Sequence, residues 1–390
     1  MKKTAYIGHN WPTPYQTLLL RASLCRGEEA INAWHEWGRD YESRELEGDS
    51  FRLLPLLYYN LRRLGLKGPA MDKLRGVYKR AWYDNQLLLH RLSGVLKTLA
   101  ASGIETMVLK GAALSVMYYP EPWLRPMTDV DILVPSSKVR STMEVLQASG
   151  HRPEHRIPES LPDFTYALSF MLDQTRVLDL HCRIMLECRW NSPDEDLWRG
   201  ALPLDILGAT TLALNPTDQL LHVCVNATRW ENAPQVRWIA DAVTIMNKSE
   251  IDWNHLKAQA LKLHLVLPLR ETLHYLHFEH DAPIPPHLLE ELRRLAVTRF
   301  ENNRHKAFAR PHPLLGALPV MWLNHRLSTP NLRTRLLGFP AFLQYVFQLD
   351  SLREVPGQIL HKALKRLLHR ASPGGRVDPR MLNEQNNSRL

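Results

Sequence analysis

The pattern of hydrophobic and polar positions changes twice along the chain. Between residues 12 and 100, leucines recur at helical spacing in two runs, 53–61 and 74–96, and a Gly- and Pro-containing turn at 65–69 separates them. Apolar residues three or four positions apart mark one face of a helix, and Gly and Pro mark turns. The sequence therefore predicts an N-terminal helical region over residues 1–100.

A different pattern occupies residues 101–190. Four short β-prone runs and two helical segments follow one another there. Strands are expected at 104–109, 129–134, 166–170 and 176–182, and helices at 112–118 and 137–148. A Lys-Gly turn ends the first strand, and Leu-Asp-Gln joins the last two as a hairpin turn. This order predicts a small α/β domain.

Helical spacing returns after residue 191. We expect a helical domain over 191–300, with segments near 216–229, 235–247, 252–262, 265–278 and 286–298. Residues 301–390 are expected to form an irregular and helical extension that ends in a disordered tail. Its segment 304–335 is rich in Pro, Arg and His and is interpreted as a loop, and its tail 383–390 is polar. The predicted class is α+β, with a small mixed sheet between helical flanks.

Three aspartates suggest a metal site in the α/β domain. Asp129 and Asp131 flank Val130 on one predicted strand, so both carboxylates project from the same face. Asp179, on the 176–182 strand, joins them if the two strands are neighbours. Clustered carboxylates repel one another, and a hard cation such as Mg²⁺ or Mn²⁺ relieves the repulsion. The three residues are therefore candidate catalytic residues and metal ligands.

Five further residues are candidates for nucleotide binding. Lys110 offers a point charge, and the N–H groups of Gly111 and Ala112 begin a predicted helix, which favours an anion. Arg125 either presents a bidentate fork to a triphosphate or forms a salt bridge with one of the aspartates. His181 lies on the same strand face as the aspartate two residues before it. There it contacts a phosphate or an acceptor, or it forms a hydrogen bond within the sheet.

These segments together resemble the uncharacterised nucleotidyltransferase family of the DNA polymerase β-like superfamily. The likeness rests on 108–114, 125–134 and 178–181 and is densest over 85–185. The resemblance implies a nucleotidyltransferase core, an NTP substrate, Mg²⁺, and attack of an acceptor hydroxyl on the α-phosphate with release of pyrophosphate. It also implies that the three aspartates are the metal ligands. The superfamily usually has Gly-Ser or Gly-Gly where this chain has Gly111-Ala112, and alanine lacks the hydroxyl that would contact phosphate.

The first hypothesis is therefore a Mg²⁺-dependent nucleotidyltransferase. A non-catalytic module that binds nucleotides or a partner is the second, because of Ala112, and kinase-like γ-phosphate transfer is the third. The acceptor is a small alcohol or sugar, a peptide or protein side chain, or an RNA end. His222 and Asp241, on separate predicted helices, either line the mouth of the cleft or form hydrogen bonds between buried helices.

Composition limits the class of protein further. Lys and Arg outnumber Asp and Glu by 49 to 40, which suits phosphate-bearing partners. No run reaches the roughly 18 apolar residues of a membrane span, and the basic N-terminus lacks the apolar core of a secretory signal. We expect a cytoplasmic protein without a transmembrane segment. The apolar segment 339–349 and the basic residues of 362–370 either touch an anionic membrane surface or dock against the helical domain.

Overall fold

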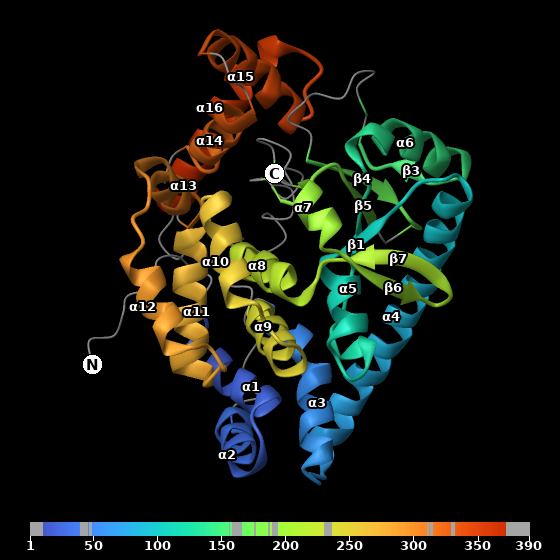
Figure 1. Ribbon diagram of the computed structural model, residues 1–390, viewed down its shortest axis with the longest axis vertical. Coiled ribbons are helices and arrows are strands. Elements are labelled where there is room, and N and C mark those ends of the chain that lie inside the picture. Colours follow the sequence, from blue (N-terminus) through green and yellow to red (C-terminus); the bar gives the residue numbers. More distant parts are fainter. Residues whose placement is uncertain are drawn as a thin grey trace.

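The computed structural model shows a mixed α+β protein with one seven-stranded sheet and helices on both of its sides (Figure 1). The described residues are 11–39, 46, 49–155, 157, 166–174, 177–185, 188, 194–229, 236–309, 312, 315–328 and 332–371. This architecture confirms the expected α+β class with helical flanks. The polar tail 383–390 lies outside the described residues.

The sheet has the strand order β3-β4-β5-β2-β1-β7-β6. Its strands are β1 (Met107–Leu109), β2 (Asp129–Leu133), β3 (Arg152–Pro153), β4 (Ala167–Met171), β5 (Val177–His181), β6 (Leu202–Ile206) and β7 (Ala209–Ala213). The pairs β2–β5 and β1–β7 are parallel, and the other neighbours are antiparallel. All four predicted strands are present, with ends that differ by up to three residues.

One part of the sheet contradicts the expectation that residues 191–300 form a helical domain. The helix α7 (Asp194–Arg199) leads into the hairpin β6–β7, and β7 extends the sheet beside β1. The hairpin turn is Leu207-Gly208, where both residues have positive φ angles, 52° and 75°. Burial alternates along both strands, as expected for strands with one covered face. Residues 202–213 therefore form two strands with alternating burial, and the expectation of helix is wrong for this segment.

The N-terminal helices agree with the expectation. They are α1 (Pro14–Leu24), α2 (Gly27–Gly38), α3 (Leu54–Arg63) and α4 (Pro69–Ala101), with the 3₁₀ turn η1 (Ser50–Leu53) before α3. α1 begins with a capping box, in which the side chains of Thr13 and Gln16 each accept a hydrogen bond from the other's backbone N–H. α4 begins at Pro69, a position where the missing N–H costs nothing.

One face of the sheet carries a large cluster of buried apolar side chains. Val130 and Ile132 of β2 and Leu178 and Leu180 of β5 are fully buried. They form one cluster with leucines of α4 and with residues of α5 (Lys110–Met117) and α6 (Val139–Ala148). The long helix α4 therefore packs in the same apolar cluster as β2 and β5, on this face of the sheet.

The C-terminal helices pack against the N-terminal ones and against the other face of the sheet. They are α8 (Pro216–Ala227), α9 (Arg237–Lys248), α10 (Trp253–Lys262), α11 (Val266–His280), α12 (Pro286–Arg294) and α13 (Arg299–Ala309). Residues of α1–α3 and of α8–α12 belong to one hydrophobic cluster. Met107, Leu109 and Leu133, on the second face of the sheet, belong to the same cluster. The apolar residues of the second face thus belong to the same core as the helices of both flanks.

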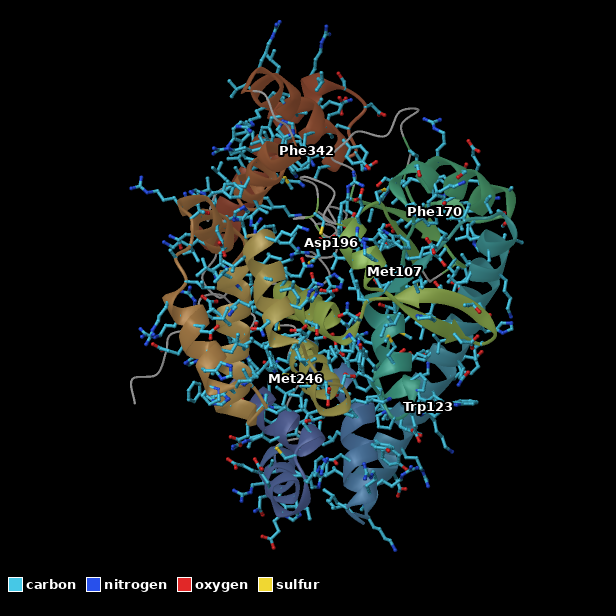
Figure 2. All side chains as sticks on the ribbon, viewed as in Figure 1. Met107, Trp123, Phe170, Asp196, Met246 and Phe342 are labelled. Carbon is cyan, nitrogen blue, oxygen red and sulfur yellow. The ribbon has the colours of Figure 1, made fainter. Side chains whose placement is uncertain are left out.

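The last three helices form a smaller unit at the top of Figure 1. They are α14 (Leu318–Ser328), α15 (Leu332–Val346) and α16 (Val355–Ala371), with the 3₁₀ turn η5 (Leu352–Glu354) before α16. The expectation of a loop over 304–335 is wrong, because parts of α13, α14 and α15 occupy it. Pro319 lies in the first turn of α14, where proline is tolerated. Figure 2 shows Phe342 in the buried cluster of this unit, apart from Phe170 in the sheet.

Candidate active site

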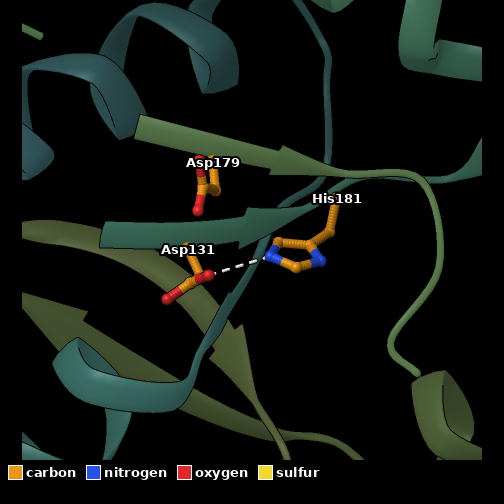
Figure 3. Close-up of side chains that lie close together, drawn as sticks. All are labelled: Asp131, Asp179 and His181. Carbon is orange, nitrogen blue, oxygen red and sulfur yellow. Dashed lines mark hydrogen bonds and ion pairs between the residues drawn. The ribbon is translucent and has the colours of Figure 1, made fainter. Parts of the chain in front are cut away.

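Two buried carboxylates lie side by side on the parallel strands β2 and β5. The register pairs Asp131 with Asp179, and each residue is only 4% exposed. Paired residues on neighbouring strands project from the same face, and Figure 3 shows the two side chains together. The predicted pairing of the two strands is confirmed, and it places these carboxylates on the face opposite the apolar cluster of α4.

Asp131 is the centre of a small hydrogen-bond cluster. The Lys110 ammonium donates a hydrogen bond to Asp131 Oδ1 at 2.7 Å, and His181 Nε2 lies 2.8 Å from the same oxygen (Figure 3). Lys110 Nζ and His181 Nε2 are 3.4 Å apart. Both close contacts use Oδ1, so they orient the carboxylate from one side. The ion pair with Asp131 therefore fixes the position of the Lys110 ammonium beside the carboxylates.

The pKa values of this pair move in opposite directions. Burial raises the pKa of the Asp131 carboxyl, but the charge of Lys110 and the hydrogen bond with His181 outweigh burial and hold the pKa well below its usual range. Burial lowers the pKa of Lys110, but the Asp131 charge outweighs it and keeps the pKa above its usual value. The pair therefore stabilises the fold between the two ordinary pKa values. That stability is lost as pH falls through the depressed Asp131 pKa or rises through the raised Lys110 pKa.

Asp179 is oriented from the other neighbouring strand. Ser169 on β4 is its partner in the register, and the Ser169 hydroxyl donates a hydrogen bond to Asp179 Oδ1 at 2.7 Å. The Tyr166 ring packs edge-on against the His181 ring, with ring centroids 4.9 Å apart. Sequence reasoning did not single out Ser169. Its signal is a lone polar position between the buried Leu168 and Phe170.

Asp129 shares the strand face of Asp131 but has a different environment. It begins β2, is only half-buried, and lies 3.4 Å from the Thr128 hydroxyl through its Oδ1. Among the described residues, the metal-capable cluster consists of Asp131, Asp179 and His181, whose ligand atoms all lie within 4.8 Å of one another. Asp129 is outside this cluster, and its role as a metal ligand stays a prediction. His181, expected beside the aspartates, is inside it.

The turn between β1 and α5 is strained and closely packed. Lys110 has a φ of +46°, in the left-handed region that non-glycine residues rarely adopt. A Cβ on Gly111 would lie 2.7 Å from Nη1 of Arg125 and 3.2 Å from Sδ of Met127, so a side chain there would force the Arg125 guanidinium to shift from its place beside Asp241. Ala112 is fully buried in the apolar cluster of α4. Backbone strain that is kept in a packed turn is typical of functional sites.

Arg125 is buried and paired with Asp241 of α9. Its Nε and Nη2 donate hydrogen bonds to the two Asp241 carboxylate oxygens at 2.7 and 2.9 Å, and the Tyr119 hydroxyl donates to Asp241 Oδ1 at 2.7 Å. Burial lowers the pKa of Arg125, but the Asp241 charge outweighs it and raises the pKa above its usual value. A salt bridge is thus present, but its partner is none of the three site aspartates. Through Gly111, this pair connects α9 to the strained turn.

His222 of α8 is a second buried histidine near the carboxylates. It is almost fully buried, and its Nε2 has no hydrogen-bond partner among the described residues. Burial, followed by the charges of Lys110 and Arg229, lowers the pKa of His222 to about 3. The imidazole is therefore neutral at neutral pH. The charges of Lys110, His181 and Asp131 all act on the imidazole, so His222 shares the electrostatic environment of the aspartate cluster.

The sequence profile of the uncharacterised nucleotidyltransferase family matches residues 49–278, more than half of the chain. The chain belongs to this family. The matched region begins before α3 and ends within α11, so it contains the whole sheet and the Asp131–Asp179 pair. The resemblance seen in the sequence is confirmed. The helices α12–α16 lie outside the residues that match the family profile.

Comparison with other proteins adds one solved structure. The crystal structure of an antigenic nucleotidyltransferase-like protein from Paracoccidioides brasiliensis is similar at 16% sequence identity and a TM-score of 0.37. The similarity covers 52% of this chain and 96% of that one. Among curated proteins, no significant match to the chain is found. None of the described helices combines the length and the apolar character that are needed to cross a bilayer.

The residues at the centre of this nucleotidyltransferase-family site fit a divalent cation. Asp131 and Asp179 bring two negative charges together in a buried place, and Lys110 balances one of them. The ligand atoms of Asp131, Asp179 and His181 all lie within 4.8 Å of one another, close enough to meet around one ion. Carboxylate oxygens are preferred by Mg²⁺ and Mn²⁺, and imidazole is an accepted ligand of transition metals. The site thus combines two neighbouring carboxylates and an imidazole, which are donor groups that such an ion accepts.

Proposed function

We propose that the protein is a nucleotidyltransferase that moves a nucleoside monophosphate from an NTP to an acceptor hydroxyl and depends on Mg²⁺ or Mn²⁺. Family membership supports nucleotidyl transfer in general. The observation that supports the more specific proposal is the buried Asp131–Asp179 pair on β2 and β5. The Lys110 ammonium donates a hydrogen bond to Asp131 of this pair. Removing two like charges from water is costly unless something compensates them, so function explains their retention better than stability does.

Asp131 and Asp179 are the residues that would hold the ion, and Asp129 would join them from the start of β2. Lys110 and His181 contact Asp131 through Oδ1. Partners of this kind orient a ligating carboxylate before an ion binds. When bound, the ion neutralises negative charge on phosphate oxygens and polarises the phosphoryl group. His181 serves here as the residue that positions Asp131, or as a further ligand.

The triphosphate would bind at the Lys110–Ala112 turn. The first N–H groups of a helix have no partner within the helix, and the helix dipole adds positive potential there. The N–H groups of Gly111 and Ala112 belong to this first turn of α5, so the lack of a serine hydroxyl removes one phosphate contact and leaves the backbone donors. Lys110 adds a full positive charge. Arg125 supports the turn through its contact with Gly111, while Asp241 holds its other two nitrogens.

The reaction is a substitution at the α-phosphorus. The acceptor oxygen forms a bond to that phosphorus, the bond to the bridging oxygen of the β-phosphate breaks, and pyrophosphate leaves. The proton of the acceptor hydroxyl passes to a carboxylate, and Asp179 is our candidate for this role. The protein contributes mainly the positioning of the reactants and the compensation of charge.

NTP that is labelled at either the α- or the γ-phosphate tests this proposal. The protein is incubated with Mg²⁺ and with a sugar, a peptide and an RNA as acceptors. We expect α-label in a product. γ-Label in the product would show kinase-like transfer, and the absence of label from every product would support the non-catalytic module.

The matched control for this assay is a second Asp→Asn variant. Asp131→Asn is expected to abolish incorporation of the α-label while the protein stays folded. Asp72→Asn changes an exposed aspartate of α4 and is expected to keep wild-type incorporation. Equal activity of wild-type and Asp131→Asn protein would refute the role of Asp131.

A further inference from the structure

The helices after α13 carry an unusual concentration of exposed leucines. Six of the exposed large apolar side chains in the described part of the chain lie between residues 336 and 367, and every one of them is a leucine. They are Leu336, Leu337, Leu352, Leu360, Leu364 and Leu367. This unit stands at the periphery of the molecule, at the top of Figure 1.

Three of these leucines form a stripe along α16. Leu360, Leu364 and Leu367 are 60%, 49% and 46% exposed, and their spacing of four and three residues places them on one helix face. A different side of α16 already packs inward, because Val355 is buried in the C-terminal cluster and Ile359 packs against that cluster. The helix therefore has two apolar sides, and within the described structure only one of them is covered.

The segment that carries these leucines is strongly basic. Residues 332–371 contain seven Lys and Arg residues, and their acidic residues are Asp350 and Glu354. The basic residues are Arg333, Arg335, Arg353, Lys362, Lys365, Arg366 and Arg370. The side chains of Arg333 and Arg353 are exposed. The charge of this segment complements a partner that is negatively charged and accepts aliphatic side chains.

Two alternative occupants fit these observations less well. A second copy of the chain would bring the same positive charges together, and like charges oppose association. At protein–protein interfaces, Trp, Tyr and Arg are enriched among the residues that contribute most of the binding free energy, whereas leucine is under-represented among them. Aliphatic side chains next to Lys and Arg are instead typical of helices that lie in the interface of an anionic membrane.

We infer that the leucine stripe of α16 and the basic residues of segment 332–371 form a peripheral docking surface for an anionic lipid bilayer. In this arrangement α16 lies in the plane of the interface, with Leu360, Leu364 and Leu367 among the acyl chains. The neighbouring Phe342 and Leu343 are buried within the protein, so the apolar segment 339–349 docks internally. The inference does not depend on the nucleotidyl-transfer proposal.

Co-sedimentation of the full-length protein with vesicles tests this inference. The vesicles contain equal parts of phosphatidylcholine and phosphatidylglycerol, and vesicles of phosphatidylcholine alone provide the uncharged comparison. We expect binding to the anionic vesicles only, with an affinity that falls as salt is raised. The triple variant L360Q/L364Q/L367Q is expected to bind about tenfold or more weakly, because it removes the inserted apolar area.

Leu261→Gln is the matched control, because Leu261 is an exposed leucine of α10, outside the C-terminal unit. It is expected to bind vesicles like the wild type. If the triple variant fails to fold, the single variant Leu360→Gln and the charge variant R353Q/K365Q take its place, and each is expected to weaken binding about threefold or more.

Three results would overturn the inference. The first is the absence of wild-type binding to anionic vesicles. The second is undiminished binding by folded leucine variants, which would mean adsorption by charge alone. The third is a leucine-dependent dimer in analytical ultracentrifugation without lipid, which would mean that a second copy covers the stripe.

Discussion

The two faces of the central sheet have different roles, although β2 and β5 contribute residues to both. One face stabilises the fold, and the other carries the carboxylates of the site. On one face, Ile132 and Leu180 are fully buried among leucines of α4. On the other, Asp131 and Asp179 are buried almost as completely. Burying a large apolar side chain stabilises a protein by about 1.5–3 kcal/mol, whereas burying a charge costs free energy unless it is compensated.

This difference separates what holds the fold from what performs the chemistry. Alternation along β2 and β5 lets one short segment serve both purposes, because consecutive residues point to opposite faces. Substitutions on the apolar face should therefore lower stability and spare the chemistry of the folded protein. Substitution of Asp179 on the carboxylate face should do the reverse, whereas loss of Asp131 also removes the partner of the Lys110 ammonium.

The largest expected effect comes from the carboxylate face. Asp179→Asn keeps the shape of the side chain and removes a charge that the metal site requires. We expect kcat/KM for nucleotidyl transfer to fall by about a thousandfold or more, while the free energy of unfolding in urea stays within about 1 kcal/mol of wild type. A variant that is fully active, or one that is inactive only because it is unfolded, would break the separation of the two faces.

The buried Arg125–Asp241 pair tests whether charged residues close to the site can stabilise the fold. Asp241→Ala leaves the Arg125 guanidinium buried without its bidentate partner. We expect a loss of about 3–5 kcal/mol in the free energy of unfolding, measured in urea. Asp72→Ala, on the surface of α4, should change it by less than about 0.5 kcal/mol. An equally small effect at Asp241 would show that this pair is not structural.

The apolar face is tested by Leu180→Ala, between Asp179 and His181 on the same strand. The cavity that it leaves should lower the free energy of unfolding by about 2–5 kcal/mol. At a temperature where the variant is folded, kcat/KM should stay within about threefold of wild type, because its side chain points away from the aspartates. A stable but inactive Leu180→Ala protein would contradict the assignment of the faces.

A smaller effect is expected where a neighbour only orients a carboxylate. Ser169→Ala removes the hydroxyl that donates to Asp179 Oδ1. Loss of such an outer partner typically costs 10–100-fold in metal affinity or activity, so we expect about that reduction in Mn²⁺ affinity. Ser102→Ala, at an exposed serine after α4, is the matched control and should leave Mn²⁺ binding unchanged.

The smallest expected effect concerns the pH dependence of stability. The pKa of His222 is lowered from 6.5 to about 3 by burial and by nearby positive charge. As pH falls below 6.5 the unfolded chain takes up a proton that the folded protein refuses, so stability decreases by up to about 1.4 kcal/mol per pH unit from this residue. His222→Gln should reduce that slope between pH 6 and 4 in urea unfolding, and the exposed His35→Gln should not. Equal slopes in both variants would mean that His222 is accessible to protons.

Much of the sheet was predictable because its signals are local. The strands around Asp131 and Asp179 alternate between apolar and polar positions, and the structure adds that β2 and β5 are neighbours. The hairpin β6–β7 shows the same alternation, but its partner β1 lies about a hundred residues earlier, so nothing local indicates that it joins the sheet. The prolines near α14 suggested a loop, yet Pro319 stands where a helix tolerates it.

The site was predictable in part: the strand faces of its residues could be inferred from the sequence, but the partners of these residues could not. Strand periodicity places Asp179 and His181 on one face of their strand and Asp131 on one face of its own, and the pairing of β2 with β5 brings these faces together. The partner of Arg125 does not, because Asp241 is 116 residues away and on a helix, and only the packing of α9 brings them together. The contact of Ser169 with Asp179 likewise depends on the register of β4, which the sequence leaves unspecified.

Binding of Mn²⁺ is the most direct test of the claim that Asp131 and Asp179 form a metal site. Electron paramagnetic resonance measures the free Mn²⁺ that remains when the ion is titrated into the folded protein, and it requires neither NTP nor acceptor. We predict saturable binding by the wild type and its loss in both Asp131→Asn and Asp179→Asn, with Asp72→Asn binding normally. Saturable binding of equal affinity in the wild type and in both site variants would contradict the claim.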